Sequence, residues 1–196
     1  LFRSSVVPQI TTIVKLAVEK ILKKNVLVVG AGIKTGLNIR IDNPAQLGSD
    51  LVVDSVAAIV EYPAPLLIFD LGTANTVCVI DKNKNYIGGM IYPGIGVSLD
   101  SLTAHASQLG GISIEAPEHM IGKNTTECMK SGLIYSSAAA MDGIIDRLQE
   151  QLGGEATVIA TGGLAKKIVP HCRREIILDD DLLLKGLAII YKKNRK

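Results

Sequence analysis

The sequence predicts an α/β fold in which a β-meander is followed by alternating helices and strands. Two observations lead to this prediction. Three short apolar runs, separated by turn residues, lie between Leu66 and Tyr92, as expected for consecutive strands. Segments with helical and with strand-like spacing of apolar residues then alternate to the end of the chain. A hydrophobic content of 47% is typical of a chain that buries a globular core.

The part of the chain before the meander supplies the order helix, strand, helix. Apolar residues recur at helical spacing in 9–24 and in 50–61, which predicts two amphipathic helices. The apolar run Val26–Val29 predicts a short strand between them, and we expect residues 36–50 to form an irregular loop around Pro44. We therefore interpret this part as the end of a domain whose beginning is missing.

The stretch Tyr62-Pro63-Ala64-Pro65 predicts a break between domains. Proline fixes its own backbone and disfavours helical geometry in the residue before it, so a helix is expected to end here. We place the domains at residues 1–62 and 63–196.

The second domain contains nine expected elements in the order β-β-β-α-α-β-α-β-α. Their expected ranges are 66–69, 76–80, 86–92, 97–109, 124–152, 157–160, a short helix from Gly163, 175–178 and 180–193. Asn124, with Glu127 three residues later, is typical of a helix N-cap. This order is that of a ribonuclease-H-like domain. Actin-like ATPases use two such domains, so we predict one complete C-terminal domain of this fold plus the remnant of a first.

Charge and composition restrict the partners. The formal net charge is only +2, which gives no global field that attracts nucleic acid. No apolar run reaches the about 18–20 residues that a membrane-spanning helix needs. The three cysteines Cys78, Cys128 and Cys172 are far apart and form no CxxC pair. We expect a cytoplasmic protein without nucleic-acid or membrane partners.

The clearest candidate for a phosphate site is Asp70-Leu71-Gly72-Thr73-Ala74-Asn75-Thr76, at the expected turn between the first two strands of the meander. A carboxylate at a strand end can hold a cation, and Gly72 lets the backbone approach a polyphosphate. The hydroxyl of Thr73 can donate to phosphate oxygens. The alternative is an ordinary hairpin in which Asp and Thr cap backbone groups.

A second candidate nucleotide motif is Ala160-Thr161-Gly162-Gly163-Leu164-Ala165, where an apolar strand runs into paired glycines and a helix. Glycines at this place let a base or ribose lie against the backbone, and the helix start offers free N–H groups. A plain strand–helix turn is the alternative. The two turns together in one domain indicate a nucleotide site more strongly than either alone.

Two further glycine-containing stretches bear on the assignment of phosphate-binding and catalytic residues. Gly30-Ala31-Gly32-Ile33-Lys34-Thr35-Gly36 is neither a P-loop nor a dinucleotide motif, because Ile33 and Thr35 stand where each pattern requires glycine. Gly48-Ser49-Asp50 precedes an apolar helix, and Asp50 is either the N-cap of that helix or a general base for phosphoryl transfer.

Taken together, the ordered motifs resemble those of type III pantothenate kinases over essentially the whole chain. The motifs are Ser4-Ser5-Val6-Val7-Pro8, Gly30-x-Gly32-Ile33-Lys34-Thr35-Gly36, Asn43-Pro44, Gly48-Ser49-Asp50, Asp70-x-Gly72-Thr73-Ala74, Gly88-Gly89, Pro93-Gly94, Ile121-Gly122-x-Asn124-Thr125, Ser131-Gly132 and Ala160-Thr161-Gly162-Gly163-Leu164. The resemblance implies a kinase that uses ATP with Mg²⁺ to phosphorylate pantothenate to 4'-phosphopantothenate, the first step of coenzyme A biosynthesis. It also implies a homodimer and a monovalent cation, K⁺ or NH₄⁺.

Carried over by position, the resemblance assigns the nucleotide side of the site to the second domain. Asp70 would hold the monovalent cation as the metal ligand. Gly72 and Thr73 would bind the ATP phosphates, and Gly162 and Gly163 would border the adenosine.

The resemblance assigns the acceptor side to two other stretches. Asp50 would be the catalytic proton acceptor, within the substrate-binding group Gly48, Ser49, Asp50 and Leu51. Thr125 would also contact pantothenate, and it can at the same time belong to the first turn of a capped helix.

Several residues depart from the family pattern. Leu51 stands where the family has arginine, Ile41 where it has a pocket tyrosine, and Cys78 where it often has aspartate. A leucine cannot replace a charged contact to a carboxylate, which contributes roughly 1.5–3 kcal/mol. The family's first phosphate loop, Asp-x-Gly-Asn-Thr, is absent, and because the chain begins with Leu1 we expect a natural start further upstream.

Three functions therefore stay open at the level of sequence. The first is a type III pantothenate kinase. The second is a catalytically impaired homologue that binds nucleotide or a partner in a regulatory role. The third is a kinase for another hydroxylated small molecule.

Overall fold

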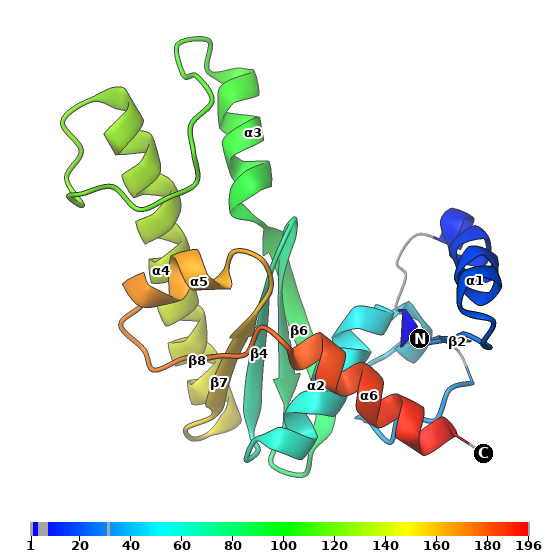
Figure 1. Cartoon of the computed structure of the whole chain (residues 1–196). Helices are drawn as coiled ribbons and strands as arrows, with labels where there is room; N and C mark the ends of the chain where they lie inside the picture. The colour runs from blue at the N-terminus through cyan, green and yellow to red at the C-terminus, as the bar shows by residue number, and fades with distance from the viewer. Residues whose placement is uncertain (1, 4–7, 31, 196) are drawn as a thin grey trace. The chain divides into compact units, whose positions relative to one another are not determined.

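The computed structural model describes residues 2–3, 8–30 and 32–195 (Figure 1). The stretch Ser4-Ser5-Val6-Val7 and Ala31, which are part of the motifs above, lie outside the described residues. Two compact units are formed. The first consists of the described residues up to Ala64, Ile80–Gly88 and those from Asp181 onwards; the second consists of Pro65–Val79 and Gly89–Asp180.

The described part of the chain contains eight β-strands and six α-helices, with short 3-10 turns. In the first unit, the elements are β1 (Phe2–Arg3), α1 (Pro8–Leu22), β2 (Leu27–Val28), β3 (Asn38–Ile39), η1 (Pro44–Gln46), α2 (Ser49–Glu61) and α6 (Leu182–Asn194). From β4 onwards they are β4 (Leu66–Leu71), β5 (Ala74–Ile80), β6 (Asn85–Pro93), α3 (Ile95–His105), α4 (Thr125–Leu152), β7 (Thr157–Thr161), α5 (Ala165–Ile168), η2 (Val169–His171) and β8 (Ile177–Leu178).

The expected order of elements from Leu66 is confirmed, and so is the α/β class with a meander followed by alternating helices and strands. Hydrogen bonds link six strands in the order β3-β6-β5-β4-β7-β8. Strands β4 and β7 are parallel, with Leu66 beside Thr157 and Asp70 beside Thr161, and β7 is also parallel to β8. Parallel neighbours place the carboxyl ends of their strands at the same edge of the sheet, which is where the two candidate nucleotide turns begin.

The second unit buries one main core between its strands and helices α3, α4 and α5, which cover the same face of the sheet. Alternate residues of β4 and β5 point into it, as the two-residue period of a strand requires. The core members from these elements are Leu67, Phe69, Leu71, Val77, Val79, Ile95, Leu99, Met129, Leu133, Ile134, Ala138, Met141, Ile145, Ala165 and Ile168. This packing fixes the strand ends from which the candidate turns project.

The first unit has a smaller core, in which helices α2 and α6 pack against each other. The contact is close because α6 carries Gly186 at the crossing. A Cβ atom at Gly186 would lie 2.7 Å from Cγ1 of Val53, a separation that real side chains do not tolerate. Strand β3 adds to this unit by pairing in parallel with the start of β6, where Asn38 lies beside Asn85.

Some expectations differ from the structure at element ends. Residues 36–50 were expected to be irregular but include β3 and η1. Strand β3 forms because it pairs with β6, next to which the N–H of Arg40 donates to the carbonyl of Tyr86 at 2.8 Å. Helix α3 ends at His105, and the N–H of Leu109 instead closes a turn on Ala106. The division into domains at 1–62 and 63–196 stays a prediction.

The cap of α4 agrees with the sequence: the Asn124 side chain accepts from the N–H of Glu127 at 2.9 Å. The helix ends at Gly153, whose φ of 75° is the left-handed conformation that glycine adopts without strain. Among the described residues, none of the helices combines the length and apolar character that crossing a bilayer requires.

Candidate functional site

The two candidate nucleotide turns lie next to each other in the second unit. Asp70, the last but one residue of β4, is half-buried and pairs in register with Thr161 of β7. The turn Gly72-Thr73 follows β4, and the turn Gly162-Gly163 follows β7. Because β4 and β7 are neighbours, their ends bring together the five residues predicted to bind the cation and ATP, which are Asp70, Gly72, Thr73, Gly162 and Gly163.

Backbone contacts lock the two turns together. The N–H of Leu164 donates to the carbonyl of Leu71 at 3.1 Å, and the N–H of Ala165 donates to the carbonyl of Gly162 at 3.1 Å. Gly162 has φ of 93°, and a Cβ atom there would lie 2.6 Å from the backbone N of Leu71 and against the Asp70 carboxylate. Only glycine fits this position, since both its conformation and its surroundings exclude a side chain.

Gly163 differs from its neighbour. A Cβ atom at Gly163 would meet no heavy atom within 4 Å, and the residue is exposed. The open side of the double-glycine turn therefore faces away from the protein. Exposed backbone at a turn beside a helix start is the arrangement against which a base or ribose can lie.

A third backbone segment meets the phosphate turn from β6. The N–H of Gly94 donates to the carbonyl of Thr73 at 3.0 Å, and Gly94 is the N-cap residue of α3. A Cβ atom at Gly94 would lie 2.6 Å from the Thr73 carbonyl oxygen. The sequence analysis named Pro93-Gly94 only as one of the family motifs and did not predict this contact; a glycine between a strand end and a helix start was the available signal.

Two polar side chains on the strands that border this turn, Asn75 and Tyr92, are shielded from solvent. Asn75 on β5 is 1% exposed, and Tyr92 on β6 is half-buried. Burial raises the pKa of Tyr92, and the Asn75 side chain opposes that shift in part. The phenol of Tyr92 therefore stays uncharged at neutral pH.

The candidate acceptor residues Gly48, Ser49, Asp50 and Leu51 form the start of α2 in the first unit. The N-cap is Gly48, so the interpretation of Asp50 as N-cap is wrong; Asp50 lies within the first turn. Its Oδ1 accepts from the N–H of Leu51 at 3.0 Å, and a Cβ atom at Gly48 would lie 2.5 Å from that oxygen. The missing side chain of Gly48 thus leaves space for the Asp50 carboxylate, and the helix start favours its negative charge.

Thr125 lies apart from these groups in the sequence and opens α4 in the second unit. It is exposed, and it directly follows the Asn124 cap. Gly122 packs against the first turn of the helix, since a Cβ atom there would lie 2.6 Å from the carbonyl carbon of Glu127. Sequence motif and structure agree that residues 122–125 form one compact helix start.

Metal-ligand chemistry at these turns rests on Asp70. Among the described residues, no group of three or more His, Cys, Asp or Glu side chains is arranged to hold a metal ion. The assignment of Asp70 to a monovalent cation stays a prediction.

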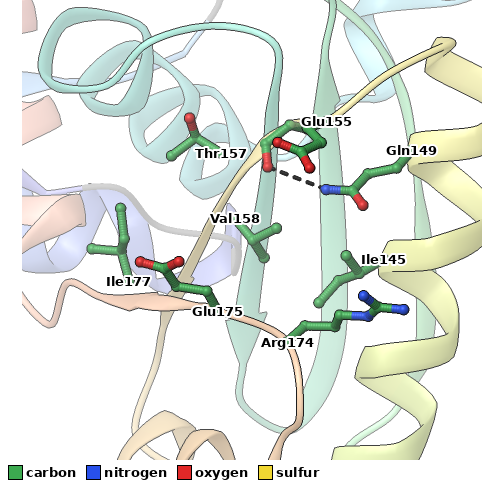
Figure 2. Close-up of a pocket in the computed structure, with 9 residues that line it drawn as sticks. Ile145, Gln149, Glu155, Thr157, Val158, Arg174, Glu175 and Ile177 are labelled. Carbon is green, nitrogen blue, oxygen red and sulfur yellow. Dashed lines mark hydrogen bonds between the residues drawn. The ribbon is translucent and has the colours of Figure 1, made fainter.

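A cavity in the second unit lies elsewhere. It has a volume of about 340 Å³ and borders Thr157, at the start of β7, whereas the nucleotide turns follow the end of that strand at Thr161. Figure 2 shows Gln149 extending from α4 at the edge of this cavity. Its Nε2 donates to the carbonyl of Ala156 at 3.4 Å. This cavity is therefore separate from the candidate nucleotide site.

Comparison with known proteins identifies the family. The family model described as type III pantothenate kinase matches residues 1–147. A type III pantothenate kinase of Bacillus cytotoxicus is 46% identical over 191 residues, covering 97% of this chain and 73% of that protein. One of an Exiguobacterium species is 44% identical over 193 residues, covering 98% of this chain and 76% of that protein.

Solved structures agree on the fold. A conserved Baf family protein from Campylobacter jejuni superposes with a TM-score of 0.63 at 21% identity, covering 98% of this chain and 82% of that one. The ethanolamine utilization protein EutJ from Carboxydothermus hydrogenoformans gives a TM-score of 0.52 at 15% identity, covering 93% and 72%. These matches are consistent with the ribonuclease-H-like fold predicted above. On the strength of the family model and the two relatives, the chain belongs to the type III pantothenate kinase family.

Proposed function

We propose that this protein is a kinase that transfers phosphate from ATP to pantothenate, giving 4'-phosphopantothenate, the first step of coenzyme A biosynthesis. The observation that carries the proposal is the contact between the two turns, Gly72-Thr73 and Gly162-Gly163, on neighbouring parallel strands. In an open sheet of this kind, ligands bind outside the carboxyl ends of the strands. Pantothenate is proposed as the substrate because the chain belongs to the type III pantothenate kinase family.

The nucleotide is proposed to bind at these turns. Gly72 and Thr73 contact the phosphates through backbone N–H and hydroxyl groups, and Gly162 and Gly163 border the adenosine. Asp70 would hold a monovalent cation, K⁺ or NH₄⁺. Bound together with ATP, Mg²⁺ would supply positive charge that stabilises the phosphoryl group during transfer.

For the acceptor, we propose as substrate-binding residues Gly48, Ser49 and Leu51 in the first unit, and Thr125 in the second. Asp50 accepts the proton of the pantothenate hydroxyl as its oxygen forms a bond to the γ-phosphorus. The bond from that phosphorus to the bridging oxygen of ADP breaks, and ADP leaves. The hydrogen bond from the Leu51 N–H leaves Asp50 lone pairs available for this proton, since a carboxylate accepts several hydrogen bonds.

We further propose a cytoplasmic homodimer. The described cysteines are free thiols, which suits a reducing compartment. In the second unit, Met120 is 64% exposed and Ile121 is 83% exposed, and large exposed apolar side chains together favour association.

The test is an assay of ADP release with and without pantothenate, on wild-type protein and on Asp50→Asn. We expect pantothenate-dependent turnover, and a fall of at least 100-fold in kcat for Asp50→Asn, because general-base catalysis contributes about 10²–10⁴-fold. Asp100→Asn, at an exposed position of α3, is the matched control and is expected to keep wild-type kcat. If ADP is released only with a different hydroxylated acceptor, pantothenate is not the substrate.

A second candidate function is nucleotide binding without turnover, in a regulatory role. Leu51, Ile41 and Cys78 favour it, since each stands where the family pattern has another residue. The same assay separates the two functions: saturable ATP binding together with no pantothenate-dependent ADP release supports this candidate.

A further inference from the structure

A second cavity of the second unit, with a volume of about 610 Å³, lies between α4 and the segment that follows α5. One wall is a single face of α4. The α4 residues that line the cavity, from Tyr135 to Asp146, follow one another at intervals of four, three and four residues. The lining residues are Met120, Tyr135, Ala139, Asp142, Asp146, His171, Arg173 and Arg174. The volume falls within the range of about 300–1,000 Å³ that small-molecule sites occupy.

Both carboxylates of this cavity already have partners. Asp142 accepts from the backbone N–H of Arg173 at 2.9 and 3.0 Å and from that of Arg174 at 3.0 Å. Asp146 binds the Arg174 guanidinium at two points, Nε to Oδ1 at 2.7 Å and Nη2 to Oδ2 at 2.9 Å. These two acidic groups are therefore committed to fixing the 173–174 backbone and the Arg174 side chain.

The Arg173 side chain differs from these two carboxylates in its interactions. Its guanidinium forms no ion pair and no hydrogen bond with any group that the structure describes, although its backbone is anchored on α4 through Asp142. A guanidinium presents five N–H donors in a planar fork that matches carboxylate and phosphate oxygens. The cavity thus contains an exposed cationic group with unused donors, on a backbone that Asp142 holds in place.

The remaining walls are aromatic and apolar. The rings of Tyr135 and His171 meet edge to face, with centroids 5.2 Å apart and planes at 71°. Met120 adds a polarisable thioether, and the Ser131 hydroxyl donates to its carbonyl and so fixes its backbone on α4. Such walls accept a flat apolar group.

From this arrangement we propose that the cavity between α4 and residues 171–174 is a binding site for a small organic anion that joins a phosphate or carboxylate to a flat apolar part. The anionic group pairs with Arg173, and the apolar part lies along Tyr135 and Met120. This site is separate from the nucleotide turns, and its occupation does not depend on turnover by the enzyme.

The cavity of Figure 2 provides a contrast within the same unit. Its rim carries Glu155 and Glu175, and its arginine is Arg174, whose guanidinium Asp146 already holds. Like charges on the rim disfavour an anion there. An anion is therefore expected to select the cavity that contains Arg173.

Phenyl phosphate is a suitable probe, because it combines a dianionic head with a flat ring. We expect saturable binding to the full chain by calorimetry, with NMR shifts confined to residues of this cavity. Arg173→Ala should weaken binding at least 10-fold, because a charge-assisted hydrogen bond contributes about 1.5–3 kcal/mol. Arg173→Lys, which keeps the charge but not the planar fork, should recover part of the loss.

Arg147→Ala is the matched control. Arg147 is an exposed arginine of α4, the helix that forms one wall of the cavity, but it does not line the cavity. Its Nη1 donates to the Gly143 carbonyl at 2.8 Å, and its loss should leave phenyl phosphate affinity unchanged. Circular dichroism confirms that each variant is folded. The proposal is overturned if phenyl phosphate does not saturate, if Arg173→Ala binds as wild type does, or if excess ADP displaces the probe, which would place it at the nucleotide turns.

Discussion

Leu164 and Leu71 are joined by a backbone hydrogen bond of 3.1 Å that ties the double-glycine turn to the end of β4. The bond needs the chain after β7 to turn sharply at Gly162, whose φ of 93° brings it against the strand. The candidate adenosine and phosphate turns are therefore one connected structure. Changes in one turn are expected to affect the other.

Gly162→Ala should lower the free energy of unfolding by about 2 kcal/mol or more, since a non-glycine residue held in an unfavourable backbone region costs about 1–3 kcal/mol and the new Cβ overlaps Leu71 N. Urea unfolding measures this. Gly163→Ala is the matched neighbour, because its Cβ would meet nothing within 4 Å, and we expect a stability change within about 0.5 kcal/mol of zero. If both variants lose the same free energy of unfolding, the difference in backbone geometry and surroundings between Gly162 and Gly163 is contradicted.

A second pair of glycines tests the start of α3. Gly94→Ala places a Cβ 2.6 Å from the Thr73 carbonyl oxygen, so it should push the phosphate turn away and destabilise the protein. Gly96 is two residues further on, within α3, and a Cβ atom there would lie in open space. Gly96→Ala should therefore stabilise the protein by about 0.5–1 kcal/mol through helix propensity. Thermal unfolding of the two variants gives the comparison, and shifts of the same sign would count against the Gly94 contact.

The sequence predicted those parts of the fold that local chemistry decides. The Asn124 cap and the strand runs beginning at Leu66 depend on residues near each other in the chain, and the structure contains both. It did not predict β3, because that two-residue strand exists only through pairing with Asn85 and Tyr86. The same holds for the candidate site. Its glycine motifs could be recognised in the sequence, but the contact of Gly94 with Thr73 depends on tertiary packing and could not be predicted.

The three cysteines should react very differently with iodoacetamide. Burial, and more weakly the charge of Asp142, raise the pKa of Cys172 to about 12, so almost no thiolate forms at pH 8. Cys78 is 1% exposed, whereas Cys128 is exposed in the first turn of α4. Mass spectrometry should find Cys128 modified first, and Cys128→Ser should remove the fast phase; rapid labelling of Cys172 in the folded protein would be incompatible with its burial.

Leu51→Arg tests the proposed substrate. A guanidinium at the start of α2 can pair with the pantothenate carboxylate, so we expect the KM for pantothenate to fall about 10-fold, in line with about 1.5 kcal/mol for such a contact. Val60→Arg is the matched control on the same helix, at a position that is 58% exposed, and should leave KM unchanged. If Leu51→Arg brings no gain, pantothenate loses support as the acceptor.

The hairpin between β5 and β6 gives a pH-dependent prediction. Desolvation raises the pKa of Asp81, but hydrogen bonds outweigh it and the net pKa is lowered. Its Oδ1 accepts from the N–H of Asn83 at 2.8 Å and of Asn85 at 2.9 Å, and its Oδ2 accepts from Asn85 Nδ2 at 2.7 Å. The positive charge of Arg40 lowers the pKa further.

A carboxyl group whose pKa is lower in the folded state stabilises the fold above its unfolded pKa, about 3.9 for aspartate, and this contribution disappears as the pH falls through the folded value. Asp81→Asn should therefore cost about 1 kcal/mol at pH 7, where the amide presents a donor to Asn85 Nδ2 in place of an acceptor. At pH 3, below the unfolded pKa of aspartate, the penalty should be smaller than at pH 7. Urea unfolding at both pH values measures the difference, with Asp100→Asn, at an exposed position of α3, as the control. A penalty that is the same at both pH values would show that the Asp81 charge contributes nothing to the hairpin.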